Sequence, residues 1–240
     1  MKKSNLILSV LLLILLTLTN CGSTSDEKDA INNAENNTSS TEGSSVMNAE
    51  SSTNTEVTIG KQVWMTENLN VDRFRNGDLI PEARTNEEWE RAGNEGKPAW
   101  CYYNNDAANG KKYGKLYNWY AVNDARGLAP KGYHIPSDAE WTLLIDYLGG
   151  ANGAGVKMKS TNGWIESGNG NNNSGFSGLP GGYRSDSGTF NYFGDHGNWW
   201  SSTESDTSDA GTRNLNGLNG NVGRSSGYER DGFSVRCLRD

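Results

Sequence analysis

The stretch GYHIPSDAEWTLLIDYLGG, residues 132–150, decides the fold of this chain. Ser137 and Glu140 have the spacing of a capping box, in which two side chains bond backbone N–H groups at a helix start. Four apolar residues then repeat at the helical period and form one face: Trp141, Leu144, Ile145 and Leu148. Gly149-Gly150 follows, where a helix end favours a left-handed residue. The stretch therefore predicts an amphipathic helix that packs its apolar face on a sheet.

Weaker signals on both sides of this helix predict further short elements. Thr85 and Glu88 form a second capping box, which predicts a short helix over 86–91. Residues 114–122 carry one apolar helical face, and alternating residues predict a hairpin over 57–65. Further strands are expected at 190–193, at 198–201, in a hairpin over 214–224 and at 233–238.

Loops fill the rest of the segment 57–240. The chain has 30 glycines among its 240 residues, and turn-forming residues separate the short apolar runs. The fold class that follows is α+β. We expect one loop-rich domain with small antiparallel sheets and two to three short helices.

The first twenty residues have the pattern of a secretory signal. Lys2 and Lys3 precede an apolar run over 6–18, which is shorter than the roughly 20 residues that cross a bilayer. Cys21 follows and resembles the lipidated cysteine of a bacterial lipobox. This pattern predicts a signal peptide over 1–20, a diacylglycerol on Cys21 and a place at the bacterial outer membrane, on either its periplasmic or its external face. An uncleaved membrane anchor is the alternative.

Residues 21–56 have the composition of a disordered linker. They are mostly Ser, Thr, Asn, Asp and Glu, and within 22–56 seven acids face one lysine. Such a segment buries too little apolar surface to offset the entropy of ordering. The whole chain carries a formal charge of −7 and shows no basic patch, so nucleic acid is not an expected partner. The expected contact with the membrane is the lipid.

Six motifs in a fixed order resemble one bacterial family. They are MTENLN (65–70), YGKLYNW (113–119), GYHIPSDAEW (132–141), GFSGLPGG (175–182), WWSSTE (199–204) and VRC (235–237). Together they look like the Fibrobacter succinogenes major paralogous domain, which occurs in secreted and lipid-anchored bacterial proteins. The resemblance covers residues 57–240 and implies an architecture rather than an activity.

A more distant similarity extends to the formylglycine-generating enzymes. It is carried by the turn at 134–136 that leads into a helix, and by the ending over 232–237. That family has a C-type-lectin-like fold whose terminal strands pair. The resemblance therefore implies that 57–65 and 233–239 lie side by side.

Cys101 and Cys237 are the cysteines that remain after lipidation. Two cysteines in an exported protein predict a disulfide. Two free, buried thiols are one alternative. A redox-active pair, as formylglycine-generating enzymes have, is another, although both of their cysteines lie in the C-terminal half and here only Cys237 does.

Acidic residues gather between positions 184 and 210, and carboxylates on loops suit calcium. The calcium candidates are Asp186, Asp195 and Glu204, with ordinary solvated loops as the alternative. His134 and His196 have no metal-binding spacing to each other or to a cysteine, so zinc is not expected. No other cofactor is predicted.

Two adjacent tryptophans, Trp199 and Trp200, lie on a predicted strand, where successive side chains point to opposite faces. One indole should enter the core and the other should face outward; the alternative is that loops cover both. An exposed aromatic ring among polar side chains is typical of a sugar- or peptide-binding surface. The candidate ligand surface, expected within 160–230, comprises Trp164, Arg184, Tyr192, Asp195, His196, Trp199 and Trp200.

These patterns together predict a lipid-anchored cell-envelope protein with a non-enzymatic binding or adhesion module. Its expected ligand is a polysaccharide or a protein. The sequence contains no phosphate-binding loop, dinucleotide fingerprint or hydrolase motif. The alternatives are an enzyme related to the formylglycine-generating family and a purely structural envelope protein.

Overall fold

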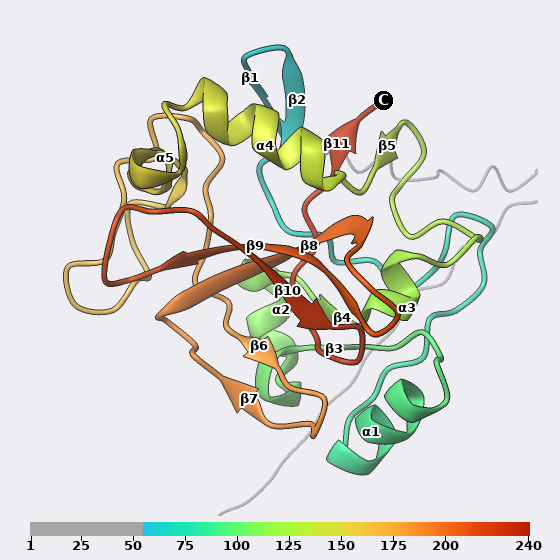
Figure 1. Ribbon diagram of the computed structural model, residues 1–240. Helices are drawn as coiled ribbons and strands as arrows, with labels where there is room; N and C mark the ends of the chain where they lie inside the picture. Colours follow the sequence, from blue (N-terminus) through green and yellow to red (C-terminus); the bar gives the residue numbers. More distant parts are fainter. Residues whose placement is uncertain (1–54) are drawn as a thin grey trace, which may run out of the picture. The chain divides into compact units, whose positions relative to one another are not determined.

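The computed structural model describes residues 55–240 (Figure 1). The predictions for the signal peptide, for Cys21 and for nearly all of the linker fall outside these residues. The described part contains five α-helices and eleven strands, which form four small antiparallel sheets. The α+β class is confirmed, with more helices than the two to three predicted. No helix in this part combines the length and the apolar character needed to cross a membrane.

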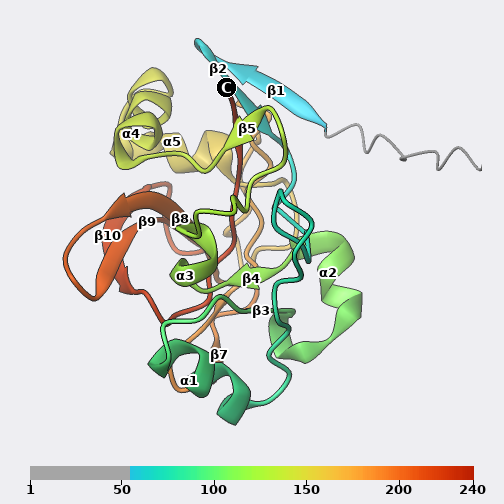
Figure 2. The ribbon, with the colours of Figure 1, turned by 90° about the vertical axis from the view of Figure 1, so that its right-hand side faces the viewer.

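The first and last strands of the domain belong to one sheet (Figure 2). Its order is β1 (Glu56–Ile59), β2 (Gln62–Met65), β11 (Leu238–Arg239) and β5 (Tyr133–His134). The N–H of Met65 donates to the carbonyl of Cys237 over 3.0 Å. The guanidinium of Arg239 pairs with the carboxylate of Glu56 at 3.0 Å. The predicted hairpin and the predicted pairing of the domain's ends are therefore confirmed.

The longest strands form a second, three-stranded sheet. Its order is β10 (Gly223–Tyr228), β9 (Asp209–Asn216) and β8 (His196–Glu204). The strand predicted at 198–201 and the hairpin predicted over 214–224 are confirmed, and both extend further than expected. Two two-stranded sheets complete the set: β3 (Trp100–Cys101) with β4 (Leu116–Tyr117), and β6 (Tyr183–Arg184) with β7 (Phe190–Asn191). The strand predicted over 233–238 is shorter than expected, since β11 begins only at Leu238.

Capping boxes begin two of the helices, as predicted. Thr85 and Glu88 cap α1 (Asn86–Asn94), and the stretch at 137–140 caps α4 (Asp138–Tyr147). Two further helices were not predicted: α2 (Ala107–Tyr113) and α5 (Ala151–Met158). Their sequences, AANGKKY and ANGAGVKM, lack an apolar repeat that would reveal them.

The helix predicted over 114–122 begins later, as α3 (Trp119–Val122). Upstream of it, Tyr117 is fully buried and extended. Its hydroxyl donates to the carbonyl of Val71 over 2.7 Å, and its N–H donates to the carbonyl of Phe233 over 2.9 Å. These long-range hydrogen bonds pair the polar groups of Tyr117 in an extended conformation. They therefore outweigh the helical pattern of the sequence.

The apolar face of α4 packs where the sequence predicts. All four of its face residues are buried: Trp141, Leu144, Ile145 and Leu148. The ring of Trp141 lies 4.8 Å from that of Trp64 in β2 and 5.8 Å from that of Phe176. These aromatic contacts attach the helix to the sheet that holds the ends of the domain.

A fully buried arginine, Arg236, joins segments that are distant in the sequence. Its guanidinium donates to the main-chain carbonyls of Met65 and Phe176 and to Oδ1 of Asn68. The same Asn68 oxygen accepts the indole N–H of Trp199 over 2.8 Å. We call this group the Arg236 network: Asn68, Phe176, Trp199 and Arg236. Because carbonyl and amide oxygens surround its charge, Arg236 needs no carboxylate, and none pairs with it within residues 55–240.

Candidate functional site

Four of the seven residues predicted to form a ligand surface are buried: Trp164, Arg184, Trp199 and Trp200. The prediction that one of the paired indoles faces outward is wrong, because both sides of β8 are covered. Trp199 joins the Arg236 network on one side. On the other side, the indole N–H of Trp200 donates to the carbonyl of Tyr117 over 2.7 Å, and its ring lies 4.5 Å from that of Phe233. The alternative, in which both indoles are covered, holds.

The other two buried residues also serve the interior. The guanidinium of Arg184 donates to three main-chain carbonyls. It lies 4.9 Å from the ring of Trp89 and 4.7 Å from that of Phe190. The indole N–H of Trp164 donates to Oγ of Ser160 over 3.1 Å. Neither Arg184 nor Trp164 offers a surface to a ligand.

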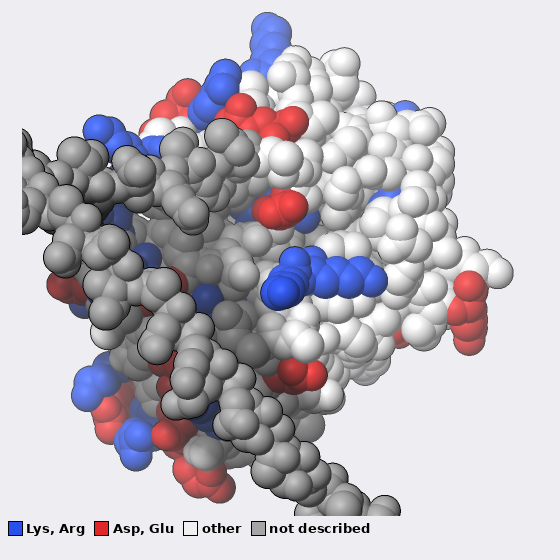
Figure 3. Space-filling view, turned by 180° about the vertical axis from the view of Figure 1, so that it is seen from behind, with Lys and Arg blue, Asp and Glu red and all other residues white. Residues whose placement is uncertain are grey.

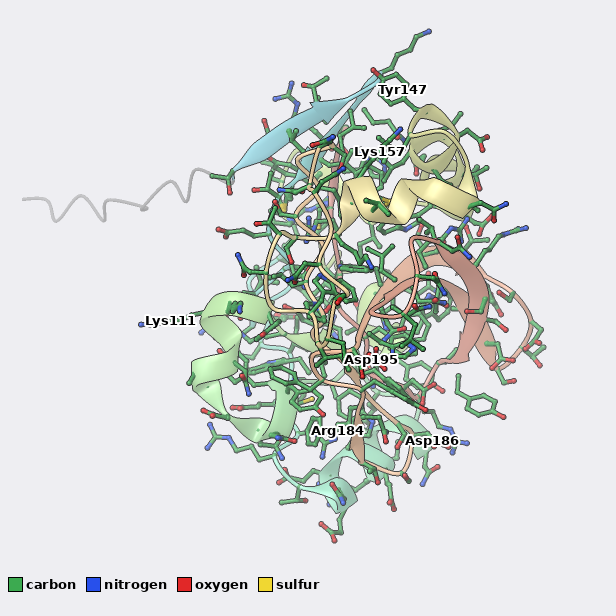
Figure 4. The ribbon with its side chains drawn as sticks, turned by 90° about the vertical axis from the view of Figure 1, so that its left-hand side faces the viewer. Lys111, Tyr147, Lys157, Arg184, Asp186 and Asp195 are labelled. Atoms are coloured by element: carbon green, nitrogen blue, oxygen red, sulfur yellow. The ribbon has the colours of Figure 1, made fainter. Side chains whose placement is uncertain are left out.

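The remaining three predicted residues, Tyr192, Asp195 and His196, gather at the start of β8; Asp195 marks the place in Figure 4. The side chain of Tyr192 is 55% exposed. Its ring stacks on that of Tyr183 at 5.9 Å and 17°, and lies 4.5 Å from the ring of His196. We call Tyr183, Tyr192 and His196 the aromatic face.

The backbone holds Tyr192 in an unusual conformation. Its φ angle of 57° lies in the left-handed region, which costs a residue other than glycine on the order of 1–2 kcal/mol. Its carbonyl accepts the N–H groups of Asp195 and His196 over 3.1 and 2.9 Å. The N–H of Gly182 donates to the carbonyl of His196 over 2.8 Å, which fixes Tyr183 beside β8. The surrounding structure therefore imposes the strain that presents this ring to solvent.

Two polar atoms near the aromatic face are buried without a hydrogen-bond partner in the described part of the chain. They are Nδ1 of His196 and Nδ2 of Asn198, two positions along the same side of β8. Oδ2 of Asp195 lies 3.2 Å from Nδ1 of His196, close enough to pair with a protonated ring but without the alignment of a hydrogen bond. Buried polar atoms are nearly always bonded, so these two are exceptions, as are atoms of Trp141, Asp209 and Arg213 elsewhere in the described part.

A buried carboxyl group, Asp231, lies within electrostatic reach of the aromatic face. Asp231 accepts the N–H of Asp186 over 2.9 Å. Burial raises the pKa of Asp231 to about 6, and the charge of Asp186 adds to this. Burial, followed by the charge of Asp231, raises the pKa of Tyr183. Neither Asp231 nor Asn198 was predicted as a site residue, because only the fold brings them to Tyr183 and His196.

Comparison with known proteins identifies the architecture. The family model described as the Fibrobacter succinogenes major domain matches residues 57–239. The chain belongs to this family. No curated protein and no solved structure matches the chain. The resemblance inferred from the six motifs is confirmed, while the more distant C-type-lectin-like similarity stays a prediction.

The motifs that mark this Fibrobacter succinogenes major domain meet in its core. Four of the six supply the Arg236 network, because Asn68, Phe176, Trp199 and Arg236 each come from a different motif. The residues of the aromatic face lie outside all six motifs. The family is thus recognised by what holds the domain together, and its name states no activity.

The two cysteines of the domain are free, buried thiols, so the predicted disulfide is not formed. Cys101 packs in a cluster with Trp89 and Leu116, whereas Cys237 belongs to a separate cluster with Trp200. Burial raises the pKa of each thiol to about 12. The alternative of two free thiols holds, and neither thiol is poised to ionise at neutral pH.

The calcium candidates have separate surroundings. Asp186 faces Arg230 at 3.5 Å, Asp195 faces His196, and Glu204 ends β8. Within residues 55–240, no three acidic, histidine or cysteine side chains are placed to hold a metal ion. Charges of both signs are scattered over the visible described surface in the view from behind, beside a broad area with few charges (Figure 3).

Proposed function

We propose that the protein is a lipid-anchored cell-envelope protein whose domain binds a polysaccharide without catalysing a reaction. The observation that carries this proposal is the exposed ring of Tyr192, held in a costly left-handed conformation. Strain that the surrounding structure maintains at a surface aromatic residue is a feature of binding sites. Packing in the core does not explain a left-handed backbone at an exposed tyrosine. A turn that needs this conformation is usually formed by glycine or asparagine.

The groups around Tyr192 suit a sugar. A tyrosine ring stacks on the apolar face of a sugar ring, and its hydroxyl stays available for a hydrogen bond. The side chains of His196 and Asp195 are partly exposed, by 28% and 20%, and can form hydrogen bonds with sugar hydroxyl groups. Aromatic rings with a few fixed polar groups are the usual composition of such a site.

The alternative of a thiol enzyme has less support. A redox-active pair requires a thiolate, and both thiols are buried with their pKa raised to about 12. The proposal of an anchor rests on the signal pattern that ends at Cys21. Mass spectrometry of the mature amino-terminal peptide tests it: a diacylglycerol on Cys21 supports the anchor, and an unmodified cysteine contradicts it.

The binding proposal is tested by a glycan array and pull-down on insoluble polysaccharides with the full-length protein. Tyr192→Ala is expected to weaken binding about tenfold or more, because the stacking surface is removed. The matched control is Tyr147→Ala. Tyr147 is 67% exposed on α4 and lies far from Asp195 in Figure 4. The proposal fails if wild type binds no glycan, or if both variants bind as wild type does.

A further inference from the structure

A polar groove lies between α2 and the segment that carries Asn68. It encloses about 370 Å³, and its lining includes Glu67, Asn70, Lys111, Lys112 and Ser177. A second hollow of about 170 Å³ shares Glu67 and Asn70 with it. The groove therefore continues along this segment on both sides of these two residues.

The floor of the groove is fixed in advance. The side-chain amide of Asn70 donates to the carbonyl of Gly110 over 3.2 Å, and its oxygen accepts from Lys115 over 3.1 Å. Lys115 is buried, with its ammonium 4.2 Å from the ring of Trp100. Ser177 has a φ angle of 57°, so a strained residue lines the groove.

The groove offers more donors than acceptors. Lys111 and Lys112 form no ion pair with any carboxylate in the described part, and Figure 4 shows Lys111 reaching outward from α2. The N–H groups of Glu67 and Asn70 likewise bond no group within residues 55–240. Two ammonium groups and one exposed carboxylate, that of Glu67, leave the lining with a charge of +1. An anionic ligand rich in acceptors fits such a surface.

The segment that carries Tyr192 contacts the end of α2, the helix that carries Lys111 and Lys112. Phe193 follows Tyr192, is 40% exposed, and lies with its ring 4.8 Å from that of Tyr113. Tyr113 directly follows the two lysines. A chain of sugar rings can therefore pass from the aromatic face to the lysines.

We infer that the ligand is an acidic polysaccharide, and that the groove binds the carboxylate groups of its uronic acid residues. The inference rests on the proposed function. Lys111 and Lys112 take the carboxylates, and Glu67 accepts from sugar hydroxyls, while Tyr192 stacks on a ring farther along the same chain. The two sites then supply charge recognition and ring recognition to one polymer.

The test compares two polymers that differ only in charge. Binding of the full-length protein to polygalacturonate is measured by calorimetry at low and high salt, beside binding to the same polymer with its carboxyl groups reduced to alcohols. The test variant is Lys111→Gln with Lys112→Gln. The control, Lys61→Gln with Arg91→Gln, removes the same charge from exposed residues of the β1–β2 turn and of α1.

Wild type is expected to bind polygalacturonate about tenfold more tightly than the reduced polymer at low salt, with the preference shrinking as salt screens the charges. The test variant is expected to lose this preference, and the control to keep it. Equal binding of both polymers by wild type, or an unchanged preference in the test variant, overturns the inference. In that case binding that still depends on Tyr192 leaves the proposed function standing. Binding of neither polymer overturns the inference as well.

Discussion

The Arg236 network and the aromatic face differ in whether their buried polar groups have hydrogen-bond partners. In the network, a fully buried guanidinium finds carbonyl and amide oxygens from segments far apart in the sequence. At the aromatic face, nitrogens of His196 and Asn198 stay unpartnered in the described part, and Tyr192 keeps a strained backbone in solvent. One region uses its polar groups to hold the fold together, whereas the other exposes a strained aromatic residue, the one on which the proposed binding rests.

This difference explains what the family match does and does not reveal. The match rests on the whole domain, and its motifs supply the Arg236 network. The residues of the aromatic face lie outside those motifs. Membership therefore reports an architecture, and a ligand has to be inferred from the residues at the site itself.

The comparison predicts its largest effect at the network. Arg236→Met removes its donors from the buried carbonyls of Met65 and Phe176, while Oδ1 of Asn68 keeps the indole N–H of Trp199. Each acceptor left unsatisfied costs about 1–3 kcal/mol, so the free energy of unfolding is expected to fall by about 3–5 kcal/mol. Urea unfolding followed by tryptophan fluorescence measures the loss.

The control for this variant is Arg84→Met, because the side chain of Arg84 is 74% exposed. Solvent screens its pairing with Glu82 at the surface, so losing this pair is expected to leave the free energy of unfolding nearly unchanged. Equal losses in the two variants would contradict the role assigned to Arg236.

An intermediate effect is predicted at Asp231, which borders the aromatic face. Its pKa rises from 3.8 to about 6 on folding because the carboxyl group is buried. The folded state therefore resists ionisation, and stability falls as pH rises between these two values. Asp231→Asn keeps an acceptor for the N–H of Asp186 and removes the ionisation. Above pH 6 the free energy of unfolding of the variant is expected to exceed that of wild type by up to about 2–3 kcal/mol. Below pH 4 the two are expected to be equal.

Chemical denaturation at a series of pH values measures this difference. Asp146→Asn is the matched control, since Asp146 is exposed on α4. A gain that is the same at pH 4 and pH 7 would show that burial of the Asp231 charge is not its cause.

The smallest change in stability is predicted at the aromatic face itself. Asn tolerates the left-handed conformation better than Tyr, so Tyr192→Asn relieves strain while it loses the contacts with Tyr183 and His196. The two effects oppose each other, and stability is expected to stay within about 1 kcal/mol of wild type. Thermal unfolding measures this change in stability. A loss as large as that of Arg236→Met would show that Tyr192 stabilises the fold, contrary to this prediction.

Local signals allowed the sequence to predict part of this fold. The prediction of α4 was correct because both of its signals are local. Ser137 and Glu140 lie three residues apart, and the apolar face repeats within ten residues. The helix α5 was missed because its glycines serve packing: a Cβ on Gly155 would lie 2.6 Å from the carbonyl oxygen of Gly220. That close approach involves residues 65 positions apart, which no local pattern reports.

The candidate site was predicted only in part for the same reason. Tyr192, Asp195 and His196 were chosen as polar and aromatic residues of one loop region, and they do lie together. One of the indoles of Trp199 and Trp200 was expected to face outward, but Phe233, which lies far from both in the sequence, covers Trp200. The left-handed backbone of Tyr192 depends on bonds from the residues that follow, and its side chain gives no signal of it.

The ion pair between Glu56 and Arg239 has a consequence for how the domain can be combined with others. The first and last strands of the domain, β1 and β11, lie on either side of β2 in one sheet, so neighbours joined at the two ends emerge close together. Such a unit can be inserted into a host loop, circularly permuted through a short glycine linker, or strung in tandem without disturbing its interior. If each copy binds as proposed, several copies in tandem would hold one long polymer at several points and bind it more tightly than a single copy.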